Sequence, residues 1–278
     1  MGHIPVLLNE VIRVLDPRPG EFFIDGTFGA GGHANAIKEK IEPGGCLLAI
    51  DWEKTGENFT DLPEILEQRG LGKADGLLID LGFSSEQINP PAGEGRGFSF
   101  LRDEPLIMTY SSEEKPVREI IRELNEKELA DVIFKYSGER FSRRIAKAIK
   151  DELRNGEINT TGKLTEVIVG AVPKGYERGR IHPATRTFQA LRIYANRELD
   201  NLEKLLQNIL TVVGPGGRAA IISFHSLEDR IVKNYFRDYA RENKLEIITK
   251  KPIIATAEEI RINPRARSAK LRAARIKN

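Results

Sequence analysis

The feature that most constrains this fold is a short apolar run that leads directly into a glycine-rich loop. Phe22 to Ile24 is followed by Asp25, then by four glycines within seven residues, and Ala34 to Ile41 has a helical pattern. This order predicts a strand, a glycine loop and a helix, an arrangement that offers backbone N–H groups to a ligand. A second apolar run, Cys46 to Ile50, ends in Asp51, an acid that suits the hydroxyls of a ribose. The pattern predicts a nucleoside-cofactor site, although such a loop can also be only a tight turn.

The other apolar runs predict a parallel, doubly wound α/β sheet. Leu77–Ile79 and Ala219–Ile222 are continuous rather than alternating, which is typical of strands buried on both faces. These strands alternate with helical segments, and ligands of such sheets collect at the carboxyl ends of the strands. The predicted strands are 22–25, 47–51, 76–81 and 218–224. The polar residues that follow them, and that predict one shared site, are Asp25, Asp51, Asp80, His225 and Ser226.

Between about Arg96 and His182 the strand signal disappears, which predicts an inserted helical domain. Its predicted helices are 117–124, 126–136, 140–154 and 164–172. A single long helix is predicted from Ala184 to about Leu210, because its apolar residues recur every three or four positions. Ser226 is expected to cap a further helix, with Asp229 three residues on.

Composition points to a cytoplasmic protein. The 278-residue chain has no apolar stretch long enough to span a membrane, and its first residues lack the pattern of a signal peptide. Its single cysteine, Cys46, is expected in the core. The net charge is only +2, but 261–278 carries seven basic residues and no acid. A basic stretch of this kind can bind phosphate backbones. A second basic cluster, Arg140 to Lys150, is expected to be a solvated helix face.

Seven motifs occur in one order along the chain: His3–Leu8, Asp25–His33, Asp75–Ser85, Arg96–Phe100, His182–Arg192, Ser223–Arg230 and Asn263–Ser268. Together they resemble those of the bacterial small-subunit (16S) ribosomal RNA (cytosine-N4)-methyltransferases, which use S-adenosylmethionine. The resemblance runs nearly from end to end, and the shared order makes it specific. It implies methyl transfer from S-adenosylmethionine to the exocyclic N4 of a cytidine, with small-subunit RNA or the assembling small subunit as partner and no role for a membrane.

The resemblance also implies a Rossmann-like methyltransferase sheet, mostly parallel, with an inserted all-helical domain. The core would comprise 1–100 and 190–278, and the insertion 101–189 would recognise RNA together with the basic C-terminal stretch. The implied cofactor contacts are Gly31, Gly32, His33, Asp51, Phe59, Asp80 and Gln87. Other roles remain open for two of them, since Phe59 suits a core position and Asp80 suits a helix cap.

The implied reaction needs no metal, and the four histidines of the chain lack the spacing of metal ligands. The nucleophile is an exocyclic amine whose lone pair is delocalised into the base, so alignment and hydrogen-bond acceptors are needed. No general base is assigned from the sequence. The candidates on the substrate side are Ser84, Ser85, His225, Ser226, Arg265 and Arg267; the serines suit turns or caps equally well.

The segment between Asp51 and Phe59 departs from the family pattern, because seven residues are too few for a crossover helix and a strand. Either the sheet is truncated or a segment is missing, and the second alternative predicts a chain break near 55–57. Two other functions fit parts of the sequence. A nicotinamide-dependent dehydrogenase would bind a different cofactor, and a ribosome-assembly factor would keep its cellular function without transfer activity.

Overall fold

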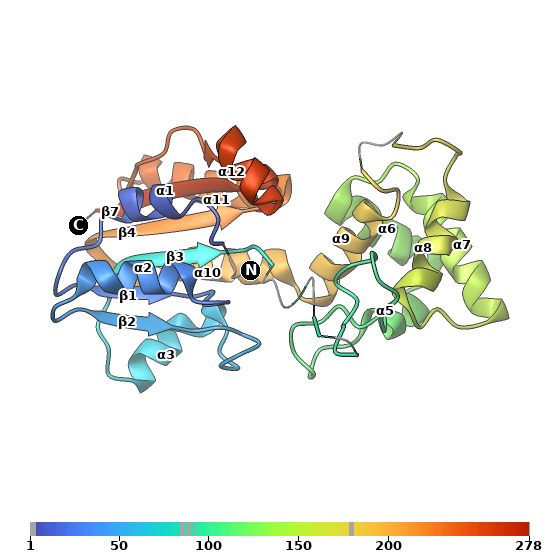
Figure 1. Cartoon of the computed structure of the whole chain (residues 1–278), viewed down its shortest axis with the longest axis horizontal. Helices are drawn as coiled ribbons and strands as arrows, with labels where there is room; N and C mark the ends of the chain where they lie inside the picture. Colours follow the sequence, from blue (N-terminus) through green and yellow to red (C-terminus); the bar gives the residue numbers. More distant parts are fainter. Residues whose placement is uncertain (1–3, 84–86, 88–89, 92, 178–180, 278) are drawn as a thin grey trace. The chain divides into compact units, whose positions relative to one another are not determined.

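The computed structural model describes residues 4–83, 87, 90–91, 93–177 and 181–277. Its contacts divide the chain into two units, 1–84 with 199–278 and 85–198. The first contains the sheet, and the second is helical (Figure 1). An α/β class with an inserted helical domain, as predicted, is therefore confirmed. The helical unit extends further at both ends than the expected range 101–189.

The sheet has the order β2-β1-β3-β4-β7-β5, and the short β6 pairs with β7. The four strands β2, β1, β3 and β4 are parallel, whereas β7 is antiparallel to β4, β5 and β6. The bounds are β1 Phe22–Asp25, β2 Cys46–Ala49, β3 Ala74–Asp80, β4 Val213–Ser223, β5 Leu245–Ile247, β6 Ile253–Ile254 and β7 Lys270–Ile276. Each predicted strand therefore exists. Cys46 is exposed, contrary to expectation, because β2 is an edge strand.

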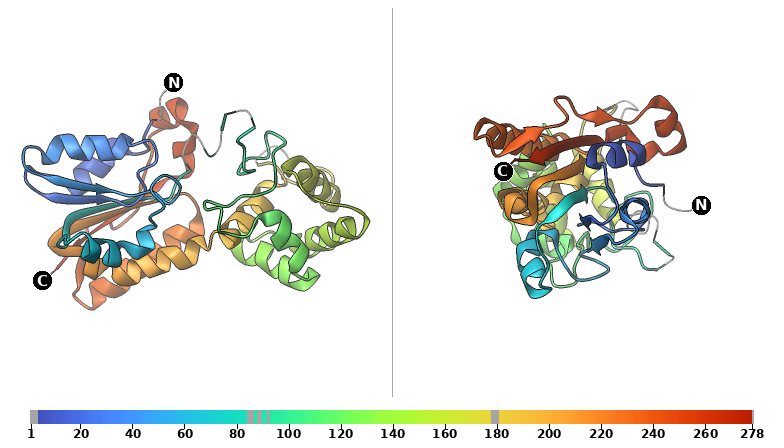
Figure 2. Two further views of the ribbon diagram at one scale, coloured as in Figure 1. Left: turned by 90° about the horizontal axis from the view of Figure 1, so that it is seen from below. Right: turned by 90° about the vertical axis from the view of Figure 1, so that its left-hand side faces the viewer.

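Helices cover both faces of the sheet (Figure 2). In β3, Leu77 and Ile79 belong to one apolar cluster and Leu78 to another. The first cluster includes residues of α3 Leu62–Gln68, α10 Glu198–Val212 and α11 Ser226–Arg241. The second includes residues of α1 Leu8–Leu15 and α2 Gly32–Ile41 and the segment around α12 Ala257–Ile262. Burial on both faces explains the continuous apolar runs of the central strands.

The long helix predicted from Ala184 to Leu210 is wrong, because the structure contains two helices there. The first, α9, covers Thr185–Ala195, and α10 begins at Glu198. Between them Arg197 has a positive φ of 50°. The fully buried Asn196 accepts a hydrogen bond from the Tyr110 backbone N–H and donates one to the Met108 carbonyl. The side chain of Asn196 thus satisfies backbone groups of another segment where the helix ends.

The helical unit has its own apolar core, which α6, α7, α8 and α9 share with α5. Its helices are α5 Val117–Glu123, α6 Glu126–Ser137, α7 Ser142–Asn155, α8 Thr161–Ala171 and α9. The four predicted helices lie within two or three residues of α5 to α8. A capping box between Asn125 and Glu128 begins α6, and Gly138 ends it at a φ of 66°. Among the helices of the described residues, none has the length and apolarity needed to cross a membrane.

Candidate functional site

Three acidic side chains follow three adjacent parallel strands. Asp25 ends β1, Asp80 ends β3, and Asp51 comes two positions after β2. Because β1 lies between β2 and β3, the structure brings these carboxyl ends to one edge of the sheet. This is the edge where parallel sheets bind their ligands.

The loop after β1 is fastened to both neighbouring strand ends. The Asp25 carboxylate accepts a hydrogen bond of 3.0 Å from the Thr27 backbone N–H. The Thr27 hydroxyl in turn accepts one of 2.7 Å from the backbone N–H of Asp80. On the other side, the Gly29 N–H donates to Asp51 at 2.8 Å. Thr27 is a linking residue that sequence reasoning missed, although its position directly after Asp25-Gly26 could have suggested it.

Gly31 and Gly32 form the junction between this loop and α2. Gly31 has a φ of 79°, and a β-carbon on it would lie 2.9 Å from the Phe28 ring. A β-carbon on Gly32 would lie 3.0 Å from Pro5. Both positions therefore need glycine for the packing of the loop itself. Among the described residues, no side chain caps α2, so the backbone N–H groups of its first turn remain suited to an anionic or polar ligand.

His33, in the first turn of α2, is buried beside Asp80. Its Nε2 lies 3.0 Å from the carbonyl oxygen of Val6, and its Nδ1 lies 3.7 Å from an Asp80 carboxylate oxygen. Because a carbonyl can only accept, Nε2 carries the hydrogen of this contact. His33 therefore connects the N-terminal segment to the acidic strand ends, with its side chain only 7% exposed.

Burial raises the pKa of Asp25 to about 6. Hydrogen bonds from Thr27, and the nearby His33 ring, favour the charged form, but burial outweighs them. The neighbouring Asp80 acts in the same direction as burial, since two carboxylates at close range disfavour ionising together. The loop therefore holds a carboxyl group that changes charge within the mildly acidic range.

Replacing Asp25 by asparagine should remove a pH-dependent loss of stability. The folded-state pKa is above the ordinary value of 3.8, so the contribution of Asp25 is fully present below pH 3.8 and is lost as the pH rises to about 6. At about 1.4 kcal/mol per pKa unit, the loss is about 3 kcal/mol. Urea unfolding at pH 4 and at pH 7.5 measures the free energy of unfolding of both proteins. Between these two pH values, the variant should gain about this much free energy of unfolding relative to the parent. Asp61→Asn, at a half-exposed carboxylate, is the control. A parent–variant difference that does not change with pH would refute the assignment.

Asp51 holds the start of the short connection that follows β2. One carboxylate oxygen accepts from the backbone N–H groups of Glu53 and Lys54, at 3.0 and 3.1 Å. The Thr55 N–H donates to the Asp51 carbonyl at 2.8 Å, which closes a turn. The backbone is continuous through this turn, so the prediction of a chain break near 55–57 is wrong. β2 lies at the edge of the sheet.

Phe59 begins a short 3₁₀ helix, Phe59–Asp61, directly after this turn. It packs partly buried against the apolar cluster on the α3 side of the sheet. A β-carbon on Gly26 would lie 3.2 Å from the β-carbon of Phe59, so Phe59 is close to the end of β1. Phe59 therefore lies close to the residue that follows Asp25, and it also contacts the apolar core.

The end of β4 is organised differently from the sequence prediction. The residue that caps α11 is His225, not Ser226, and its box partner is Glu228. The buried Glu228 carboxylate accepts from the backbone N–H groups of Phe224 and His225, at 2.8 and 3.2 Å. Ser226 is the exposed first residue of the helix. Asp229, the expected partner of Ser226, instead binds Arg272 at 2.7 Å. The expected Ser84 and Ser85 loop lies outside the described residues.

The basic C-terminal stretch is only partly a free surface. Arg272 is buried against Asp229, and Lys270 lies 3.5 Å from the same carboxylate. Arg275 donates to the Gly216 carbonyl. Arg265 and Arg267 lie in the 3₁₀ turn Pro264–Ser268, where Arg265 is partly buried and Arg267 is exposed. Asn263 shapes this turn, since its side chain accepts from the Arg265 N–H and donates to the Ile4 carbonyl.

In the helical unit, two of the sequence motifs meet. The Phe100 ring stacks on His182 with centroids 4.8 Å apart, and contacts Phe188 edge to face at 5.2 Å. Arg96 donates to the carbonyls of Thr109 and Tyr110. Gln87, the remaining expected cofactor residue, is assigned to this unit.

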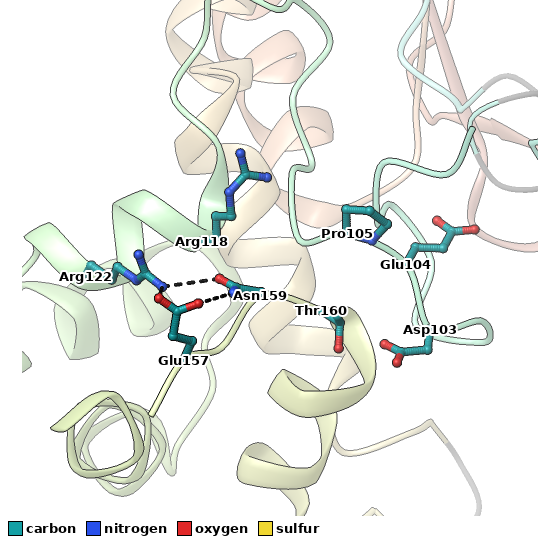
Figure 3. Close-up of a pocket in the computed structure, with 8 residues that line it drawn as sticks. All are labelled: Asp103, Glu104, Pro105, Arg118, Arg122, Glu157, Asn159 and Thr160. Carbon is teal, nitrogen blue, oxygen red and sulfur yellow. Dashed lines mark hydrogen bonds and ion pairs between the residues drawn. The ribbon is translucent and has the colours of Figure 1, made fainter. Parts of the chain in front are cut away.

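A hollow of about 520 Å³ in the helical unit is lined by charged groups, of which Arg122 and Glu157 pair with each other (Figure 3). Arg122 lies 3.0 Å from Glu157 and donates to the side chain of Asn159 at 3.2 Å. Asp103 accepts from the Gly162 N–H at 2.8 Å, and hydrogen bonds from Thr160 and Gly162 lower its pKa. Arg122, Glu157 and Asp103 are therefore engaged by neighbouring groups of the same unit.

A model of the MraW methylase family matches the chain in two parts, residues 1–56 and 53–277. The two parts meet at the short connection after Asp51. This division agrees with a chain that lacks a segment which the family pattern has at that point.

Curated relatives match over nearly their whole length. A protein named ribosomal RNA small subunit methyltransferase H from Rickettsia akari (strain Hartford) is 42% identical over 310 residues, covering 98% of both chains. A protein of the same name from Geobacter sulfurreducens is 42% identical over 308 residues, again covering 98% of both. Both alignments are longer than this chain of 278 residues, so the relatives contain residues that it lacks.

Among solved structures, a protein-(glutamine-N5) methyltransferase from Alicyclobacillus acidocaldarius matches with a TM-score of 0.41 at 13% identity. That match covers 98% of this chain and 91% of the other. TrmN from Thermus thermophilus also matches with a TM-score of 0.41, at 11% identity over 97% of this chain and 48% of the other.

Proposed function

Because the chain belongs to the MraW methylase family, we propose that it transfers a methyl group from S-adenosylmethionine to the exocyclic N4 of a cytidine in small-subunit ribosomal RNA. The observation that supports this most directly is the loop between β1 and α2. It joins an uncapped helix N-terminus to the acids of three adjacent strand ends, where a nucleoside cofactor with a polar tail would fit.

We propose cofactor contacts around this loop for the residues that match the family motifs. The Asp51 carboxylate has acceptor capacity beyond its three backbone contacts and is suited to the ribose hydroxyls. The backbone at Gly31 and Gly32 suits the methionine end. Phe59 stays in the set on the resemblance alone, because it packs against the apolar cluster on the α3 side of the sheet. Asp80 and His33 border the same edge.

Gln87 is also kept in the proposed set of cofactor residues. It is carried over from the family motif, in which it follows the strand that ends at Asp80. Exchange of Gln87 for alanine should weaken S-adenosylmethionine binding in a calorimetric titration, and an unchanged affinity would remove it from the set.

When bound, S-adenosylmethionine supplies an electrophilic methyl group on a positively charged sulfur. The cytosine amine would take up this methyl group, with release of S-adenosylhomocysteine and of one amine proton to solvent. The side chains of Asp25, Asp51 and Asp80 give this edge a negative potential that favours a sulfonium cation. The protein's contribution is alignment and exclusion of competing orientations, because the amine is a weak nucleophile.

The target base must leave its stack to reach such a site. We propose that Ser84, Ser85, His225 and Ser226 lie on the substrate side, and that Arg265 and Arg267 with the helical unit contact RNA. Of these, Ser226 and Arg267 are exposed, whereas the His225 ring is largely taken up by its contact with Glu228. The proposed partner is small-subunit RNA or the assembling subunit, which places the protein in the cytoplasm.

Methyl transfer from labelled S-adenosylmethionine to small-subunit particles and to naked small-subunit RNA tests the function. Nucleoside analysis should find the label in N4-methylcytidine. Label in another nucleoside, or none in either substrate, would refute the proposal. Arg265→Ala with Arg267→Ala should flatten the salt dependence of RNA binding by roughly 0.7 log units per lost contact. An unchanged slope would exclude this pair from the RNA surface.

A further inference from the structure

Three arginines gather at the beginning of α7, Arg143 and Arg144 in its first turn and Arg140 two residues before it. Arg140, Arg143 and Arg144 are exposed, and within the described residues no carboxylate pairs with them. Further along the same helix, Lys147 and Arg154 both lie in ion pairs with Asp151. The cations in the later part of α7 are thus neutralised by an acid of the same helix, whereas those at its beginning are not.

Two of these guanidinium groups are held in place by aromatic rings. The guanidinium carbon of Arg140 lies 5.1 Å from the centroid of the Phe141 ring and 4.9 Å from that of Tyr176. The guanidinium carbon of Arg144 lies 5.6 Å from the Phe141 centroid. Stacking occupies the flat face of a guanidinium group and leaves its N–H edges available. Those edges form the fork that binds a phosphate through two parallel hydrogen bonds.

The ring on which Arg140 stacks is itself fixed by a buried network. The Tyr176 hydroxyl is 3.0 Å from both oxygens of the fully buried Glu139 carboxylate, and it accepts a hydrogen bond of 2.8 Å from Arg186. Glu177 pairs with the same arginine. This network orders the platform in advance, so less side-chain entropy remains to be lost when Arg140 binds a ligand.

An open hollow of about 720 Å³ lies beside the platform. Arg140, Tyr176 and Arg186 line it together with Ser137, Gly138, Gly175 and Glu177. Its size is within the range of sites that accept nucleotide-sized groups. The hollow and the stacked arginines therefore offer both space and phosphate-binding edges on one side of the unit.

The charge pattern of α7 opposes the stability of the helix. Its first turn contains Arg143 and Arg144 and no acid, although the positive end of the helix dipole lies there. Cations at this end are unfavourable in the free protein, and a bound anion relieves the repulsion. A solely structural role does not explain why the pair lies at this end.

We propose that Arg140, Arg143 and Arg144 bind backbone phosphates of the RNA substrate. This inference rests on the proposed function for the identity of the RNA. Phosphate contacts position a nucleic acid without reading its bases, so this surface contributes affinity and register but no sequence preference.

The test is a variant in which all three arginines become glutamine, in the full chain. Its affinity for small-subunit RNA should fall at least tenfold at 0.1 M salt. The slope of log K against log salt should decrease by about 2, at roughly 0.7 per lost contact. The matched control replaces the paired cations Lys147, Arg154 and Lys163 by glutamine, which removes the same charge from the same unit. S-adenosylmethionine affinity and urea unfolding are measured for both variants.

The expected result is loss of RNA binding only in the arginine variant, with cofactor affinity unchanged and stability equal to or above that of the parent. An arginine-to-lysine variant should recover the salt slope but only part of the affinity, because lysine lacks the fork. Equal slopes in the two glutamine variants, or a fall in stability that accounts for the lost binding, would overturn the inference. Equal competition by a mononucleotide would make this a small-ligand site instead. If the parent protein binds and methylates no small-subunit RNA, the proposed function itself fails.

Discussion

Replacing Asp51 by alanine should weaken S-adenosylmethionine binding at least tenfold, which corresponds to about 1.4 kcal/mol of binding free energy. The substitution removes the acceptor proposed for the ribose hydroxyls. It also removes the acceptor of three backbone N–H groups, among them that of Gly29 in the glycine loop, 2.8 Å away. Both losses act on the same ligand site, so the effect should exceed that of a single surface contact.

Calorimetric titration of the purified variant measures this affinity directly. Asp61→Ala is a suitable control. It removes a half-exposed carboxylate of the same unit, which pairs with Lys204. An Asp51→Asn variant should fall between the parent and alanine, because one oxygen acceptor remains. Unchanged affinity in Asp51→Ala would show that this acid only shapes the turn.

Replacing Arg272 by alanine should lower the free energy of unfolding by about 3 kcal/mol. The guanidinium group is 9% exposed and binds Asp229, itself 14% exposed, at 2.7 Å. Burial works to raise the pKa of Asp229, but the hydrogen bond and charge of Arg272 lower it overall, with help from Lys270. Alanine would leave a carboxylate with little solvent and only the more distant lysine beside it.

Urea unfolding at neutral pH tests this, with Arg267→Ala as an exposed arginine control from the same basic stretch. A double variant, Arg272→Met with Asp229→Leu, should recover much of the stability, because both buried charges are then removed. The stabilisation from Asp229 should be present above its ordinary pKa of 3.8 and be lost as the pH falls through its lowered folded value. A loss below 1 kcal/mol in Arg272→Ala would show that the pair contributes little.

The strands were predictable because their signal is local. Burial on both faces gives a continuous apolar run, and Leu77, Leu78 and Ile79 identify β3 without knowledge of its neighbours. The meeting of Asp25, Asp51 and Asp80 at one edge could also be anticipated, since parallel strands that end in acids bring those acids together. The fold and the site edge therefore follow from patterns contained within single segments.

Two of the departures depend on partners that are distant in sequence, and the third depends on a local capping box. The α9–α10 break comes from hydrogen bonds between Asn196 and the segment at Met108 and Tyr110, which helical periodicity cannot reveal. His225 caps α11 because Glu228 returns to its backbone, whereas Asp229 is taken by Arg272 from β7. Residue types alone favoured serine as the cap. Contacts that the residue types alone do not reveal therefore make His225 rather than Ser226 the cap, and make Asp229 the partner of Arg272.

The short strands at the two ends of the sheet affect how the protein behaves at high concentration. An exposed edge presents unpaired backbone groups to which a strand of another molecule can add, and long flat edges promote aggregation. Here β2 has four residues and β5 has three. Each edge therefore offers few hydrogen bonds to an incoming strand. The border formed by β2 is therefore too short to be a strong template for polymerisation.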